Sequence, residues 1–115
     1  MITPEYFDVV FPLIKNAELW VKTRSKTRGP HGGDVYTWSG DDYIEAYREP
    51  FGSALASNEY GLDVECQDRI FCPPLTALVE GAGVYYTDRD GEPDAIVVSA
   101  APWPGHVECL LSRKR

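Results

Sequence analysis

The sequence predicts a single-domain α+β protein, in which an antiparallel sheet of about four to five strands packs against two or three helices. Two observations carry this prediction. β-branched and aromatic residues flank Asp90-Gly91 in the stretch 84–99, a pattern typical of two strands joined by a tight turn. Thr3-Pro4-Glu5 begins a run of apolar residues spaced three and four apart, which is typical of an amphipathic helix. A chain of 115 residues supplies one core, so we expect one domain over residues 1–115.

The N-terminal third contains this helix and a basic segment. Pro12 lies beyond the first helical turn, where it removes a backbone hydrogen bond, so a kink or break is expected there. The alternating cations and hydroxyls of residues 22–28 indicate either an exposed edge strand or a flexible loop. The glycines of residues 29–33 predict a hairpin loop, and residues 35–38 predict a short strand.

The middle of the chain predicts a helical segment over residues 41–60. Tyr43, Ile44 and Tyr47 fit one face of a helix that ends near Glu49, before Pro50. A second short helix is expected over residues 53–60, ended by Gly61.

The C-terminal half predicts mainly strands. Residues 62–66 alternate in polarity, and the apolar residues 70–72 follow Arg69, so 62–66 and 69–72 are both expected to be extended. A short helical turn is expected after Pro74. The remaining predicted strands of the sheet are 84–88, 94–99 and 106–111.

The negative charge of the protein is concentrated in its middle third. The whole chain has a net charge of −7 at pH 7, and residues 34–66 alone carry −7 because Arg48 is the one cation among eight acids. A field of this sign repels nucleic acid and attracts basic surfaces. We therefore expect no direct binding of nucleic acid.

Four of these acids stand out by their spacing. On a helix, residues four apart lie on one face about 5 to 6 Å from one another, close to the phosphate repeat of a nucleic-acid strand. Such a face is either an interface for a basic groove or simply solvated. The four acids are Asp41, Asp42, Glu45 and Glu49.

Three aromatic residues flank the acids, and interfaces favour tyrosine and tryptophan. The alternative for each of them is packing in the core. We name them with the acids as candidate partner-binding residues: Tyr36, Trp38 and Tyr43.

These features predict a small acidic protein that occupies a basic, nucleic-acid-binding surface of a larger protein, as a monomer or dimer. In size and charge alone, the chain is similar to phage-encoded inhibitors of host defence, such as anti-CRISPR proteins, and to immunity proteins. The alternative is a structural or assembly subunit, such as a phage connector or tail component, which uses the edge of the hairpin expected over residues 84–99 and the segment 22–28 for contacts between copies.

We expect neither an enzyme nor a cofactor. No nucleophile motif is present, so a small Cys/His enzyme ranks third. The ligand types of a zinc site are present but lack its spacing, so no metal is expected. These residues are Cys66, Cys72, His106 and Cys109.

The odd number of cysteines predicts free thiols, which are typical of the cytoplasm. No apolar run approaches the length of about 20 residues that a membrane helix needs. The N-terminus also lacks the pattern of a secretory signal. We therefore expect a cytoplasmic protein.

Overall fold

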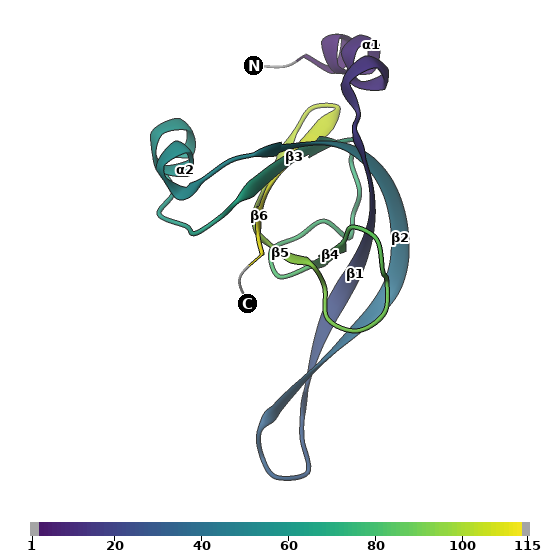
Figure 1. Ribbon diagram of the computed structural model, residues 1–115, viewed down its shortest axis with the longest axis vertical. Coiled ribbons are helices and arrows are strands. Elements are labelled where there is room, and N and C mark those ends of the chain that lie inside the picture. Colours follow the sequence, from purple (N-terminus) through teal and green to yellow (C-terminus); the bar gives the residue numbers. More distant parts are fainter. Residues whose placement is uncertain (1–2, 114–115) are drawn as a thin grey trace.

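Residues 3–113 are described by a computed structural model, in which six antiparallel strands close into a barrel flanked by two helices (Figure 1). Around the barrel the strands follow the order β1-β2-β3-β6-β5-β4, and β4 pairs with β1 to close the ring. The elements are α1 (Pro4–Ile14), β1 (Ala17–Arg28), β2 (Asp34–Pro50), α2 (Ser53–Tyr60), β3 (Asp68–Cys72), β4 (Gly83–Tyr85), β5 (Ala95–Trp103) and β6 (His106–Ser112).

The predicted fold of four to five strands packed against two or three helices is therefore wrong, and only 17% of the chain is helical. The main error is the helix expected over residues 41–49, which is the second half of β2. This half pairs with β1 on one side, at Glu18 and Glu45, and with β3 on the other, at Glu49 and Arg69. Its side chains alternate between the barrel interior and the outer surface, as the buried Ile44 shows.

Three further predictions of local structure are also wrong. β4 and β5 pair only at Gly83 with Ile96 and at Val84 with Ala95, so residues 86–94 are a loop and no tight turn at Asp90-Gly91 joins two long strands. Residues 62–66 are not a strand, and the segment after Pro74 forms turns without a helix.

The predicted start of α1 and the predicted end of α2 are confirmed. The Thr3 hydroxyl accepts a hydrogen bond from the amide of Tyr6 at 3.2 Å, which caps α1. The helix continues through Pro12 and ends two residues later, so the proline lies in its last turn. α2 ends at Gly61, whose φ of +66° lies in the left-handed region that glycine adopts easily.

The main core fills the barrel interior. Val21, Ile70, Val84 and Leu111 are fully buried there. The loop 73–82 closes one end of the barrel, because Leu78 points inward and is 5% exposed. A second cluster lies outside the barrel beneath α2, formed by Phe51, Ala56, Cys66 and Leu110. No helix among residues 3–113 has the length and apolar character that crossing a membrane requires.

Candidate interaction surfaces

A two-stranded arm projects from the barrel, at the bottom of Figure 1. We define the arm as residues 23–39, where β1 and β2 pair with each other and β1 has already left β4 at Lys22. Six strand residues on each side extend it by about 20 Å. The loop at its tip is closed by hydrogen bonds between Gly29 and Gly33 and between Gly32 and Gly29. The hairpin loop predicted for residues 29–33 is thus confirmed, and the basic segment is a strand.

A bulge and an aromatic contact hold the base of the arm. Gly40 and Asp41 together oppose Lys22, and Gly40 has a φ of +84°, which suits the extra residue of a bulge. The ring of Trp38 packs on Gly83 so closely that a Cβ there would lie 2.9 Å from it. Beyond Trp38 every side chain of residues 25–37 is exposed, so the outer arm contributes little to the core.

The two faces of the arm differ in chemistry because side chains alternate along each strand. One face carries mainly hydroxyl side chains, because Thr23, Ser25 and Thr27 lie opposite Ser39, Thr37 and Val35. The other face carries the cations and aromatics, and the guanidinium of Arg24 lies 4.8 Å from the ring centre of Tyr36. Asp34 lies opposite Arg28 on the same face, and its carboxylate is 3.2 Å from the amine of Lys26. We call this the basic face; its residues are Arg24, Lys26, Arg28, Asp34, Tyr36 and Trp38.

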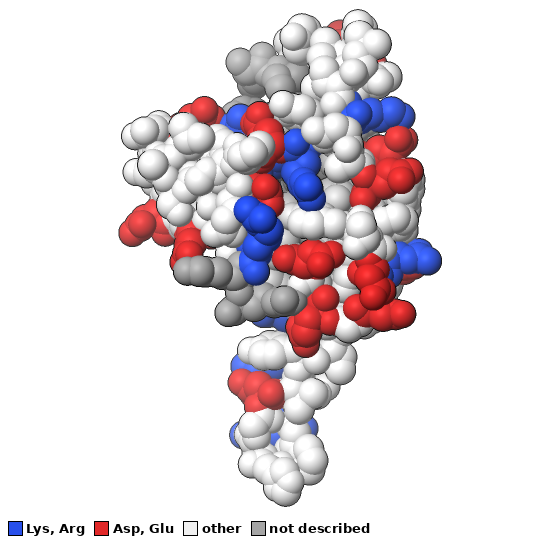
Figure 2. All heavy atoms as spheres, in the orientation of Figure 1, with Lys and Arg blue, Asp and Glu red and all other residues white. Residues whose placement is uncertain are grey.

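The arm and the rest of the protein carry opposite charge. Three cations and Asp34 give the arm a net charge of +2. Since the whole chain carries −7, the remainder carries −9. Acidic residues gather on the body of the molecule above the arm in Figure 2. The molecule is therefore strongly polarised in charge.

The four acids that were expected on one helix face do not all share a face of β2. Asp41, Glu45 and Glu49 lie on the outer face of β2, whereas Asp42 lies opposite Val21. Residues four apart share a face in a strand as in a helix, but they are about 13 Å apart instead of about 6 Å. The spacing that was expected to imitate a phosphate backbone is therefore absent.

Cations of the same chain pair with all three outer carboxylates. Lys15 lies 2.8 Å from Glu45, Arg89 lies 2.7 Å from Asp41, and Arg69 pairs with Glu49. The first two pairs are well exposed, and such pairs stabilise a fold by about 0 to 1 kcal/mol. These partners reduce the negative charge that the outer face of β2 presents to another protein.

The three candidate aromatics are separated. Tyr36 is 46% exposed on the arm, while Trp38 is at its base. Tyr43 lies on the barrel, where its hydroxyl donates to Glu18 at 2.9 Å. This hydrogen bond is the main cause that raises the pKa of Tyr43 to about 12. Only Tyr36 is thus both exposed and placed away from the core.

A polar network outside the barrel was missed by the sequence analysis. Tyr60 of α2 donates to one oxygen of Glu108 at 2.5 Å, and His106 lies 3.0 Å from the other. Arg69 joins Tyr60 to Glu49 and Glu59. Burial, followed by the bond to Glu108, raises the pKa of Tyr60 to about 12. The network fastens α2 to β3 and β6.

The alternation of His106 and Glu108 along a strand is the one sequence signal for this network, because it places both on one face. His106 is fully buried and stacks on Phe7, which brings α1 onto the barrel. The network is therefore covered by both helices, and its contacts account for the attachment of these helices to the barrel.

The zinc-type ligands are dispersed. Cys72 and Cys109 lie inside the barrel, Cys66 lies beneath α2, and His106 lies on the outer side of β6 under α1. No three metal-ligating side chains come together among residues 3–113. All three cysteines are free and buried, which confirms the predicted thiols.

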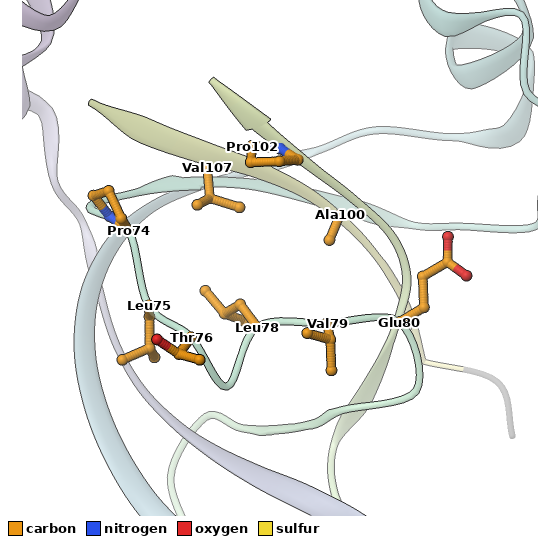
Figure 3. A pocket seen from close by; sticks show the side chains of 9 residues that line it. All are labelled: Pro74, Leu75, Thr76, Leu78, Val79, Glu80, Ala100, Pro102 and Val107. Carbon is orange, nitrogen blue, oxygen red and sulfur yellow. The ribbon is translucent and has the colours of Figure 1, made fainter. Parts of the chain in front are cut away.

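An apolar hollow of about 500 Å³ lies between the loop 73–82 and the strands β5 and β6. Figure 3 shows Leu75 and Leu78 on one side of it, and Ala100, Pro102 and Val107 on the other. Glu80 supplies the one charged side chain of its lining. This hollow lies at the closed end of the barrel and is widely open to solvent.

No protein-family model matches the chain, and no curated protein sequence matches it either. Among solved structures, the chain is similar to the solution structure of protein SF1141 from Shigella flexneri 2a. The TM-score is 0.61, and the match covers 85% of this chain and 91% of that one. With 16% sequence identity, this likeness shows the fold alone.

Proposed function

We propose that this chain is a structural or assembly subunit, which binds neighbouring copies of itself through the arm. The observation that carries the proposal is a basic, exposed ribbon attached to a closed, acidic barrel. This class includes components such as phage connectors and tails. A cytoplasmic location remains part of the proposal, supported by the three free thiols.

The strand edges support this proposal. A closed barrel has no free edges, whereas both edges of the arm are open beyond Lys22. A two-stranded ribbon is only marginally stable in water by itself. A partner that covers the arm would lower the cost of ordering it.

The charges support binding between like copies. An arm of +2 attracts a body of −9, and the arm cannot reach the far side of its own body. Association through unlike patches on two copies leaves one free patch of each kind, so it continues into a ring or a filament.

Solution mass across a wide range of protein concentrations tests this function. We expect the wild type to form species larger than a dimer. The matched variant lacks the outer arm: residues 25–37 are replaced by Asn-Gly, which joins the paired residues Arg24 and Trp38 through a two-residue turn. It should stay folded and monomeric. A wild type that is monomeric at every concentration, or an armless variant that assembles equally well, would contradict the proposal.

The acidic inhibitor of a basic surface is the second candidate, favoured by a different set of acids. Asp88, Asp90 and Glu92 are exposed on the loop 86–94 and form no ion pair among residues 3–113. For this function the protein stays a monomer or dimer. Neutralising these three acids should then slow association with the basic protein and flatten its salt dependence. Equal rates for the neutralised and wild-type proteins would contradict it.

A further inference from the structure

The helix α1 exposes an apolar stripe on the side that faces away from the barrel. Phe7 and Phe11 face inward and are buried. Val9 and Leu13 are 69% and 81% exposed and lie four residues apart on this outer face. Tyr6 is 58% exposed at the edge of the face, where it also lines the cleft between α1 and the barrel. A helix that is apolar on two sides is typical of one that is covered on both.

Acidic side chains border this stripe. Glu5 and Asp8 are exposed and give residues 4–14 a net charge of −2, since these residues include no Lys or Arg. Neither carboxylate forms an ion pair within residues 3–113, unlike the outer acids of β2. The outer face of α1 is therefore both apolar and acidic.

The basic face of the arm matches this surface. It combines cations with the exposed Tyr36, and its net charge of +2 balances the −2 of α1. The two surfaces lie at opposite ends of the long axis, which extends over 51 Å (Figure 1). Each copy thus carries one surface at one end and its complement at the other.

We propose that the basic face of the arm in one copy binds the outer face of α1 in a second copy. This inference rests on the proposed function and names the two surfaces of its contact. Tyr36 packs among Tyr6, Val9 and Leu13, while Arg28 meets Glu5 or Asp8 and Lys26 exchanges its ion pair with Asp34 for one with the other acid. The contact joins unlike surfaces, so it repeats head to tail. A basic ribbon also suits DNA, but the charge of −9 on the rest of the chain opposes that partner.

Two double substitutions of the same residue types test the contact. Val9→Lys with Leu13→Lys changes the outer face of α1. Val79→Lys with Leu55→Lys changes two other exposed sites, one of which lines the hollow of Figure 3. All four side chains are at least 46% exposed, so both variants should fold. The α1 variant should associate at least about tenfold more weakly than the wild type, and the control should not change.

The decisive measurement is the mass of the complex formed when the armless variant and the α1 variant are mixed. The armless variant keeps α1, and the α1 variant keeps its arm, so each alone should be monomeric. Together they should form a one-to-one complex that does not grow. Equal assembly of the α1 variant and the wild type, or weaker assembly of the control, would overturn the contact while leaving arm-mediated assembly in place. A monomeric wild type whose arm binds a fluorescent DNA duplex would overturn both.

Discussion

Replacing Val97 by aspartate tests the closed barrel most directly. Val97 is 1% exposed and points into the interior, where it belongs to the main core. Its neighbour Ile96 lies on the outer side of β5 and is partly exposed. The same substitution at two adjacent positions therefore places a carboxylate inside the barrel or outside it.

The loss in free energy of unfolding for Val97→Asp arises mainly because the new carboxyl group must bind a proton in the interior. An aspartate with an ordinary pKa of about 3.9 is ionised in the unfolded chain at pH 7, and binding a proton in the apolar interior then costs about 4 kcal/mol. Losing the buried valine adds about 2 kcal/mol. A domain of this size is stable by about 6 to 17 kcal/mol, so Val97→Asp removes a third of the stability or all of it. Ile96→Asp should cost less than about 2 kcal/mol.

The loss of stability in Val97→Asp should depend on pH in a characteristic way. The folded-state pKa of the new carboxyl group is raised, so its penalty is absent near pH 4 and grows by about 1.4 kcal/mol per pH unit up to that raised pKa. Urea unfolding of wild type and both variants at pH 5 and pH 7, followed by tryptophan fluorescence, measures it. Equal losses for the two variants, or a Val97→Asp loss that does not change with pH, would refute the barrel as described.

Other predictions follow from burial and pairing. Burial raises the pKa of Cys72 to about 12 and also raises that of Cys109, so a thiol reagent at pH 8 should count three thiols after unfolding and leave these two unreacted in the native protein. Glu49→Gln should lower the free energy of unfolding by about 1 to 3 kcal/mol, because its guanidinium partner is only 14% exposed, while Asp42→Asn should change it by less than about 0.5 kcal/mol in urea unfolding. The raised pKa of Tyr60, about 12, means that its contribution to stability is intact below pH 10 and lost as the pH rises through 12; Tyr60→Phe should flatten that alkaline loss in thermal unfolding.

The sequence determined the elements whose ends are set by local chemistry. Thr3 and Pro4 begin α1, and Gly61 ends α2, because a hydroxyl cap, a fixed φ and a left-handed glycine act within one helical turn. The strands β3 and β6 were also predictable, since the apolar run at the end of β3 and the alternation of polarity from His106 to Cys109 in β6 both indicate extended chain. Three free thiols followed from the odd number of cysteines.

Only the tertiary structure shows that the second half of β2 is a strand and where its acids lie. Spacings of four residues between Asp41, Glu45 and Glu49 fit one face of a helix and one face of a strand equally well, so local pattern did not separate the two. The choice came from pairing on both sides, with β1 and β3, because the ring of strands closes only if this segment is extended. In the closed barrel these acids lie farther apart than on a helix, and each pairs with a cation from a distant part of the chain. No periodicity in the sequence records such long-range contacts, which form only when the barrel does.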